Sequence, residues 1–389
     1  MRRSLFGLIP VVFCVSLAGL VLSACGKSPP GITPAEEGAL EMPASDPHRF
    51  YVLNPLWIAP ATQMFAVDGA NEKFLALMDG GYMARAAFSA NQKEIFVSES
   101  YWERGTRGKR SDVITFYDAR TLTDTGEVPL PAGRFVTGAK KHIFTITPED
   151  KYLLSMNVTP AFSVSVVDVA DREYVGEIET PGCTLVLPAA PDRFSMICTD
   201  NTLLTVKIRG AGDYERMRSE PFFSAGKDPL MDQPDFERSN ATAWFVSYAG
   251  MIHAIDLSKD APQFLAPWSI VSASEQAADW RPGGTQMIAA NSAIGRLYVL
   301  MHQGEEWTHK EAGTEVWVFD TKTRKKIGRI RLPNATDSIA VTRDSEEPRL
   351  YALSSDESVV SIFDALTLKA QGEVDEMGYY SAFLYVAGD

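Results

Sequence analysis

Short apolar runs separated by turn-forming residues occupy the chain from about residue 49 onward. The runs are rich in β-branched and aromatic residues and are bounded by Gly, Pro, Asp and Asn, while helical periodicity is nearly absent. One unit recurs, in which an apolar strand ends in aspartate, a polar turn follows, and a second strand ends near proline or glycine. The aspartates that end these strands are Asp68, Asp118, Asp168, Asp256, Asp320 and Asp364. This pattern predicts an all-β fold built from repeats.

The spacing of these aspartates predicts the number of repeats. They are 50, 50, 88, 64 and 44 residues apart. Because 88 is twice 44, a further copy is expected between Asp168 and Asp256, at residues 204–208. Seven units of this length match a seven-bladed β-propeller with four antiparallel strands in each blade.

Each blade also needs an innermost strand near the axis of the ring. Apolar runs in suitable gaps predict these strands at residues 84–89, 142–147, 183–188, 285–291 and 338–342, with a weaker candidate at 229–237. The last run, 381–387, is expected to join 49–53 and 63–68 in one blade. Pairing the N- and C-terminal strands in this way closes the ring and removes free sheet edges.

The first 48 residues lack this pattern. Residues 1–24 combine a basic end, an apolar stretch and small residues, which is typical of a secretory signal. Cys25 follows Leu-Ser-Ala and resembles the lipidated first residue of a bacterial lipoprotein, with plain cleavage near Ala24 or an uncleaved anchor as alternatives. Residues 25–48 are rich in Pro, Gly and acid and are expected to form a flexible tether before a propeller at 49–389. We expect export to the periplasm, with membrane anchoring if Cys25 carries a lipid.

Charge and cysteine content narrow the partners further. The formal net charge is −13 and becomes −15 when Arg2 and Arg3 leave with the signal, so nucleic acid and anionic membranes are disfavoured as partners. Cys14 lies in the signal, which leaves Cys183 and Cys198 besides the lipid candidate. In an oxidising compartment these two are expected to form a disulfide, with two free buried thiols as the alternative. Cys183 opens one predicted strand and Cys198 ends the next antiparallel strand, which places them opposite each other.

Signatures of common enzymes are absent from the sequence. It contains no Gly-x-Ser-x-Gly elbow, phosphate loop, dinucleotide fingerprint or zinc-spaced Cys or His pair, so we assign it no catalytic residue and no metal site. His302 and His309, with Glu305 and Glu306 between them, form the one candidate metal group, but a solvated hairpin loop is the favoured interpretation. The seven tryptophans fall in different predicted blades and are interpreted as packing and interface residues.

One predicted hairpin differs in charge from the rest of the acidic chain. Residues 101–110 carry four positive charges and two aromatic residues. Aromatic residues beside arginine favour contacts with another protein. Trp102, Arg104 and Arg107 are therefore candidate partner-binding residues, and a solvated charged turn is the alternative.

Several segments together resemble a known bacterial family. They are residues 46–52 (Asp-Pro-His-Arg-Phe-Tyr-Val), 78–82 (Met-Asp-Gly-Gly-Tyr), 107–112 (Arg-Gly-Lys-Arg-Ser-Asp), 181–183 (Pro-Gly-Cys), 198–200 (Cys-Thr-Asp), 250–257 (Gly-Met-Ile-His-Ala-Ile-Asp-Leu), 280–284 (Trp-Arg-Pro-Gly-Gly), and 308–310 (Thr-His-Lys) ahead of 316–320 (Val-Trp-Val-Phe-Asp). In unbroken order over about residues 46–389, they are similar to the heavy subunit of quinoprotein amine dehydrogenases, the methylamine and aromatic-amine enzymes that carry tryptophan tryptophylquinone. Residues 300–302 and 315–320 look closer to the aromatic-amine branch.

The resemblance implies a periplasmic complex of two heavy and two light subunits. The light subunit would hold the quinone and the catalytic aspartate, so this chain would carry no cofactor. Primary amines would be oxidised to aldehyde and ammonia, with electrons passed to a blue copper protein such as azurin or amicyanin. One rival hypothesis is a non-catalytic scaffold or binding propeller that has lost its light-chain partner. Another is a stand-alone enzyme in the propeller channel, which is disfavoured because the sequence shows no convergent titratable residues.

The resemblance also singles out one residue for the substrate channel. In the family, an aromatic residue that follows Asp-Gly-Gly, usually phenylalanine, lines the channel. The matching residue here is Tyr82. A phenol would make the entrance narrower and more polar than a phenyl ring. Taken without the resemblance, Tyr82 is interpreted as a packing aromatic at the entry to a blade.

Overall fold

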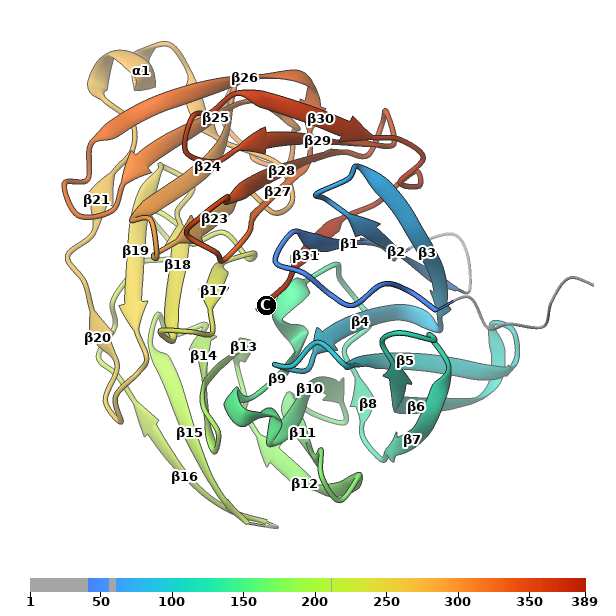
Figure 1. The fold of residues 1–389 in the computed structure, drawn as a ribbon. Helices are drawn as coiled ribbons and strands as arrows, with labels where there is room; N and C mark the ends of the chain where they lie inside the picture. Colours follow the sequence, from blue (N-terminus) through green and yellow to red (C-terminus); the bar gives the residue numbers. More distant parts are fainter. Residues whose placement is uncertain (1–40, 56–60, 211) are drawn as a thin grey trace, which may run out of the picture. The chain divides into compact units, whose positions relative to one another are not determined.

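Seven antiparallel sheets form a ring around a central axis (Figure 1). The computed structural model describes residues 41–55, 61–210 and 212–389. The sheets are numbered as blades in chain order, and their strands are given from the axis outward. Blade 1 contains β31 (Phe383–Val386), β1 (Arg49–Asn54), β2 (Thr62–Asp68) and β3 (Lys73–Gly80), and blade 2 contains β4 (Tyr82–Phe88), β5 (Glu94–Arg104), β6 (Arg107–Asp118) and β7 (Asp124–Leu130).

The next five blades complete the ring. Blade 3 contains β8 (Gly133–Arg134), β9 (Phe144–Ile146), β10 (Tyr152–Thr159), β11 (Ser163–Asp168) and β12 (Glu173–Glu179), and blade 4 contains β13 (Cys183–Ala190), β14 (Arg193–Cys198), β15 (Leu203–Gly210) and β16 (Asp213–Arg218). Blade 5 contains β17 (Asp235–Glu237), β18 (Thr242–Val246), β19 (Met251–Asp256), β20 (Gln263–Phe264) and β21 (Trp268–Ser269). Blade 6 contains β22 (Trp280–Pro282), β23 (Ile288–Asn291), β24 (Arg296–Gln303), β25 (Gly313–Asp320) and β26 (Lys326–Thr336), and blade 7 contains β27 (Ser338–Val341), β28 (Arg349–Ser354), β29 (Val359–Asp364) and β30 (Ala370–Val374).

The predicted seven-bladed propeller is confirmed, including its closure. β31 pairs antiparallel with β1, so that Tyr51 lies opposite Tyr385 and the two ends of the ring share blade 1. The copy expected at 204–208 is β15 of blade 4. Blades 3, 5 and 6 have five strands because one of the four strand positions is divided into two segments.

Four of the predicted innermost strands are markedly shorter than expected. The run at 285–291 is extended only at β23, and the run at 381–387 only at β31. The run at 142–147 begins as the 3-10 helix η1 (Lys141–Ile143), and only β9 behind it is extended. The weak candidate at 229–237 contributes only β17. In these two segments Lys141 and Asp235 take part in buried ion pairs, and the main-chain nitrogen of Lys141 donates to the Gln233 side chain.

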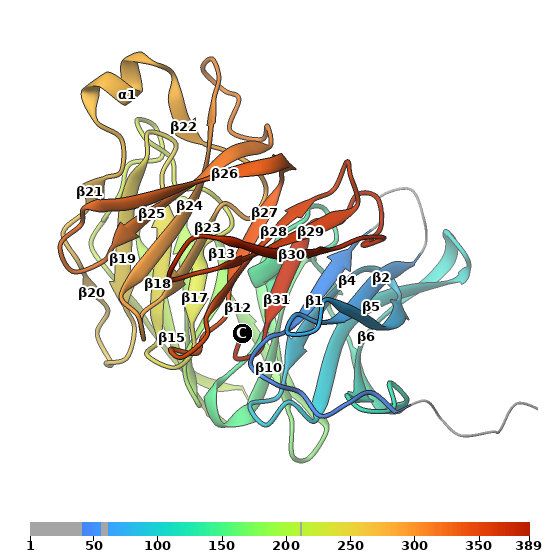
Figure 2. The same cartoon turned by 45° about the horizontal axis from the view of Figure 1, so that its top comes forward.

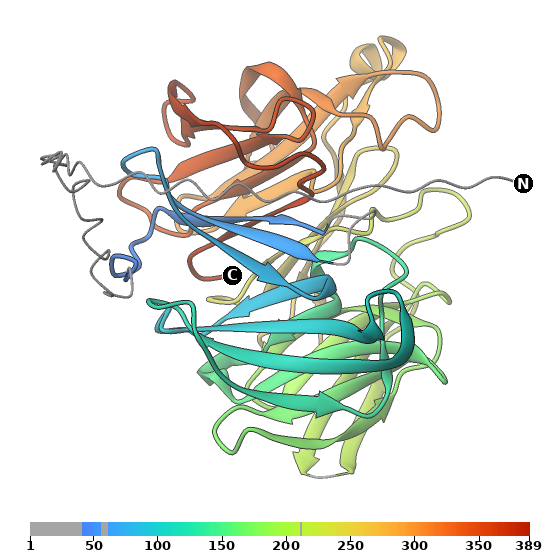
Figure 3. The same ribbon diagram turned by 90° about the vertical axis from the view of Figure 1, so that its right-hand side faces the viewer.

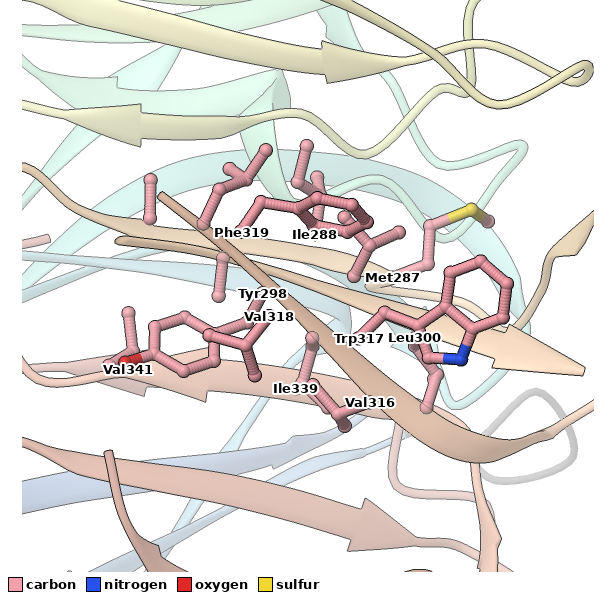
Figure 4. Close-up of a cluster of buried hydrophobic side chains, with 14 of the residues drawn as sticks. Met287, Ile288, Tyr298, Leu300, Val316, Trp317, Val318, Phe319, Ile339 and Val341 are labelled. Carbon is pink, nitrogen blue, oxygen red and sulfur yellow. The ribbon is translucent and has the colours of Figure 1, made fainter. Parts of the chain in front are cut away.

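The core lies between neighbouring blades. In blade 6, the side chains of Tyr298, Trp317, Val318 and Phe319 are buried from both faces of the sheet (Figure 4). A sheet covered on both faces has apolar residues in unbroken runs, whereas the outermost strand β26 alternates between exposed and buried positions. This difference explains why the sequence shows continuous apolar runs for the middle strands and weaker patterns for the outer ones.

The repeating aspartates close the turns between the third and fourth strands. Asp118 accepts hydrogen bonds from the main-chain nitrogens of Arg120 (2.9 Å) and Thr121 (2.8 Å), and Asp364 does the same for Leu366 (2.8 Å) and Thr367 (2.7 Å). An aspartate whose side chain mimics the main chain of a turn in this way has a structural role. These residues therefore mark the fold and are not candidates for catalysis.

The predicted disulfide is confirmed. Cys183 is the first residue of β13 and Cys198 is the last of β14, and they face each other in the antiparallel register. Their sulfur atoms are bonded at 2.04 Å, with a sequence separation of 15 residues. In the chain-entropy model, a loop of this length stabilises the folded state by about 3 kcal/mol.

The segment before β1 contacts the propeller. Its residues from Glu41 onward are described, and Met42 is buried in the core cluster of blades 1 and 2, with its main-chain nitrogen bonded to Arg120 O at 2.8 Å. Arg49 Nη2 donates to Pro43 O (3.2 Å). The end of the expected tether, 41–48, thus packs on the domain, whereas 1–40, which include Cys25, lie outside the described residues. No helix within the described ranges is long and apolar enough to cross a membrane.

Candidate functional site

Tyr82 begins β4 directly after a tight Gly-Gly turn. The main-chain nitrogen of Gly81 donates to Glu99 Oε2 at 2.6 Å, and Glu99 is buried. A Cβ on Gly81 would lie 2.7 Å from Ser100 O and 3.1 Å from the ring of Tyr101, so no side chain fits there without movement. The glycine lets the turn approach β5 closely, and this approach fixes where Tyr82 starts.

Two residues predicted for different roles lie in contact. Tyr82 and Trp102 are both half-buried, and their rings meet edge to face with centroids 5.5 Å apart and an interplanar angle of 78°. Trp102 comes from β5, next to β4 in blade 2, which stands beside blade 1 (Figure 3). The guanidinium carbon of Arg110 lies 5.6 Å from the centroid of the Trp102 ring. The candidate channel residue and the candidate partner-binding residue thus form one site.

Residues 101–110, which we call the basic hairpin, project from the ring. β5 and β6 extend beyond the other strands of blade 2 (Figures 1 and 2), and Arg104 pairs with Arg107 near the tip. Both side chains are exposed, and within the described part of the chain neither has an ion-pair partner. Two free guanidiniums on an extended arm of an acidic protein are available to another molecule.

Exposed aromatic side chains gather at one end of the ring. In these antiparallel blades, the first and third strands start, and the second and fourth strands end, at that end. Its exposed rings, which we call the aromatic face, are Tyr101, Phe162, Trp307, Tyr379 and Tyr380. Tyr82, at the start of the innermost strand β4, lies at the same end. At the opposite end, Leu366 is exposed in the turn between β29 and β30, and Phe74, Phe264, Leu265 and Ile327 are exposed along or beside the outermost strands near that end.

Sequence reasoning missed most of the aromatic face. Trp307 is 70% exposed and stacks on Tyr248, with centroids 5.0 Å apart. The sequence predicted a packing or interface role for it, as for the other tryptophans, but not its place on this face. Tyr379 and Tyr380 are 68% and 62% exposed in the connection to β31. The available signal was the presence of aromatic residues in loops between predicted strands, where burial does not explain them.

The segment that contains His302 and His309 is not entirely the solvated hairpin loop that the sequence predicts. His302 belongs to β24 and is buried, and its Nε2 lies 2.9 Å from Thr308 Oγ1. Burial lowers the pKa of both His302 and His309. Among the described residues, no three His, Cys, Asp or Glu side chains are grouped closely enough to hold a metal ion.

Titratable residues do converge in the central channel, which the sequence did not reveal. Asp235, Arg343, Asp389 and Lys141 form a chain of ion pairs across the axis, at 2.8, 2.7 and 2.6 Å. Burial, followed by the charge of Lys141, lowers the pKa of the neighbouring His142 to about 4, so that this histidine is neutral at pH 7.

The charged groups of the channel bind one another and leave little space. The cavity beside Lys141, His142 and Asp389 holds only about 30 Å³. Arg343 is held by two carboxylates; burial lowers its pKa, but Asp235 and Asp389 outweigh this effect and raise it. A cavity of this volume has room for water but not for an organic substrate.

Solved structures with a similar fold have little sequence in common with this chain. A dihydro-heme d1 dehydrogenase, NirN, has a TM-score of 0.58 at 14% identity, covering 88% of this chain and 76% of that chain. A functionally unknown protein from Desulfotomaculum acetoxidans has a TM-score of 0.57 at 13% identity, covering 87% of this chain and 98% of that chain. At such identities the likeness shows the propeller fold alone.

Sequence comparison gives a narrower result. The family model of the methylamine dehydrogenase heavy chain matches residues 46–387. The methylamine dehydrogenase heavy chain of Methylophilus methylotrophus is 32% identical over 345 residues, covering 89% of this chain and 85% of that protein. That of Paracoccus versutus is 34% identical over 341 residues, covering 87% of this chain and 79% of that protein. This chain therefore belongs to the methylamine dehydrogenase heavy chain family.

Proposed function

We propose that this protein is the heavy subunit of a periplasmic amine dehydrogenase that oxidises primary amines to aldehyde and ammonia. Its quinone cofactor lies on a separate light subunit, in a complex of two heavy and two light chains. Family membership supports the heavy-subunit role. The light subunit is proposed to dock on the aromatic face. The observation that supports this is the exposure of its aromatic rings, because exposed aromatic side chains clustered on one surface are typical of a protein interface.

The tryptophans of the described chain do not fit a quinone that reacts with substrate. One Trp–Trp contact occurs there, between Trp280 and Trp317, with centroids 5.2 Å apart. Trp317 is fully buried, and its ring is covered by Lys326 Nζ at 3.2 Å and by the guanidinium carbon of Arg329 at 4.2 Å. An amine cannot reach a ring enclosed in this way, so this pair is packing. Family membership supports placing the cofactor on the light subunit.

In the proposed complex, Tyr82 forms part of the wall of the substrate channel. Its position at the aromatic face puts it beside the docked light subunit, and its half-buried ring is held against Trp102. A tyrosine hydroxyl narrows the entrance and adds a polar group to it. The size of the amine that enters then depends on this side chain. The closer likeness to the aromatic-amine branch stays a prediction about which amines are preferred.

The basic hairpin is proposed to contact the partner subunit. Trp102 is the aromatic anchor, and Arg104 and Arg107 supply exposed positive charge on an otherwise acidic chain. Aromatic and arginine side chains dominate binding energies at protein interfaces. Electrons are proposed to pass from the light subunit to a blue copper protein of the azurin or amicyanin type. The heavy chain is assigned no part in this step.

Co-expression with the light subunit of the same organism and its maturation proteins tests the proposed function. We expect the two chains to co-purify and to reduce a dye when a primary amine is added, while the heavy chain alone does neither. Trp307→Ala together with Tyr379→Ala should weaken capture of the light subunit by at least about 2 kcal/mol, as removal of interface anchors does.

The matched control for this experiment is Leu366→Ala, which removes an exposed apolar side chain at the opposite end. It should leave capture of the light subunit unchanged. Failure of the heavy chain to retain any light subunit would instead support the scaffold hypothesis. If the double variant and Leu366→Ala weakened capture of the light subunit equally, the aromatic face would not be the docking surface.

We also propose that Cys25 is lipidated and that the protein is attached to the membrane through its N-terminal segment. The Leu-Ser-Ala-Cys boundary supports this proposal. Cys25→Ala is expected to move the protein from the membrane fraction to the soluble periplasmic fraction, as measured by fractionation and immunoblotting. An unchanged distribution, with no acyl mass on the N-terminal peptide, would rule out the lipid anchor.

A further inference from the structure

A buried arginine holds the main chain at Tyr82. Arg134, in β8 of blade 3, is fully buried, and its Nη2 donates to Tyr82 O while its Nη1 donates to Met83 O at 3.0 Å. Its Nε donates to Ser100 Oγ at 3.0 Å. Burial, followed by the charge of Arg85, lowers the pKa of Arg134 to about 9, so it remains charged at pH 7. The start of β4 is thereby fastened to the next blade.

Asp112 connects this arginine to a second one. Its Oδ1 accepts hydrogen bonds from Arg110 Nε at 2.9 Å and from Ser100 Oγ, and its Oδ2 lies 3.4 Å from the main-chain nitrogen of Arg134. Arg110 Nη2 also donates to Arg134 O at 2.8 Å. Because Asp112 is nearly buried and lies between two guanidiniums, it balances their charge and fixes the position of Arg110.

Arg110 in turn covers the ring of Trp102, which meets the ring of Tyr82. The contacts therefore form a closed circuit. One arm runs from Asp112 through Arg134 to the carbonyl of Tyr82, and the other runs from Asp112 through Arg110 and Trp102 to its ring. A side chain held at both main chain and ring keeps a single orientation with little loss of freedom on substrate entry.

We propose that Arg110 is a positioning residue that fixes Trp102, and through it the ring of Tyr82, and so tunes which amines enter the channel. This inference rests on the proposed function of Tyr82. Arg110 does not touch substrate; it acts through the indole that it covers. The same carboxylate, Asp112, orients both arms of the circuit, so the hairpin and the entry of β4 move as one unit.

The test compares selectivity in the heavy–light complex. The ratio of kcat/KM for methylamine to that for a bulky arylalkylamine is measured in the wild type, Arg110→Ala, Tyr82→Ala and the double variant. Arg110→Ala should change this ratio about two- to five-fold, as loss of one cation–π contact would, and in the same direction as Tyr82→Ala. The double variant should resemble Tyr82→Ala, because Arg110 acts only through that ring. Arg110→Lys should retain part of the wild-type ratio.

Arg172→Ala is the matched control. Arg172 covers the ring of Phe116 at 4.8 Å and pairs with Glu94, so it makes the same kinds of contact away from Tyr82. Its loss should leave the ratio unchanged at a similar thermal midpoint. A ratio that shifts with Tyr82→Ala but not with Arg110→Ala, or fully additive shifts, would overturn the inference. A complex without any amine oxidation would count against the proposed function instead.

A second readout needs only the purified heavy chain. An indole and a phenol held in one orientation give a near-UV circular dichroism signal, which Trp102→Phe should reduce. Arg110→Ala should reduce the same component, and Arg172→Ala should leave it intact. A spectrum that changes with Trp102→Phe but is identical in Arg110→Ala and the wild type would show that Arg110 does not hold the indole.

Discussion

Replacing Asp235 by alanine is expected to destabilise the propeller by about 3 to 5 kcal/mol, the usual cost of removing one partner of a buried ion pair. Asp235 is buried at the start of β17 and accepts from both Nη atoms of Arg343, at 2.8 and 2.9 Å, and from the main-chain nitrogen of Ala290 at 2.7 Å. Its loss leaves Arg343 with Asp389 as its one remaining carboxylate among the described residues. Urea denaturation measures the change in free energy of unfolding.

A matched control separates burial from charge. Glu215 pairs with Arg209 in blade 4, but both side chains are more than half exposed, so Glu215→Ala should cost less than about 1 kcal/mol. Asp235→Asn should fall between the two variants because the amide keeps one acceptor oxygen. If Asp235→Ala cost no more than Glu215→Ala, the ion pairs across the channel would not hold the inner strands together.

Replacing Tyr82 by alanine is expected to shift amine selectivity by about 1 to 3 kcal/mol in favour of bulky amines, as truncation of a pocket side chain does. Without the ring, the entrance widens on the side of β4, and Trp102 loses its edge-to-face neighbour. Steady-state kcat/KM of the heavy–light complex for a series of primary amines of increasing size measures this change. The ratio of kcat/KM for small and large amines gives the difference in their transition-state stabilisation, which is the predicted change.

Two further variants interpret the result for Tyr82. Tyr82→Phe keeps the ring and removes only the hydroxyl, so a partial shift would assign part of the selectivity to polarity. Tyr214→Ala removes another half-buried tyrosine, in the outer strand β16, and should leave the ranking unchanged. Equal losses for every amine in Tyr82→Ala, or no change at all, would show that Tyr82 is a packing residue.

The sequence by itself determined the architecture. The aspartates from Asp68 to Asp364 close equivalent turns, so their spacing reports the number of blades without any knowledge of long-range contacts. The disulfide between Cys183 and Cys198 followed from the same reasoning, because antiparallel register places the two ends of one hairpin side by side. Such local rules survive folding because each blade is built from consecutive strands.

Only the tertiary structure decided which side chains meet at the ends of the strands. Tyr82 and Trp102 are 20 positions apart in the sequence and were assigned to separate roles, yet the β4–β5 pairing puts their rings in contact. The sequence assigned no role to Arg134 or to Asp112, although Asp112 ends one of the segments of the family resemblance, because a charged residue in a strand usually indicates an exposed position. The channel ion pairs between Asp235, Arg343 and Asp389 join segments far apart in the chain. Closing a ring places the ends of distant strands at one axis and one face, and no periodicity along the chain encodes which side chains meet there.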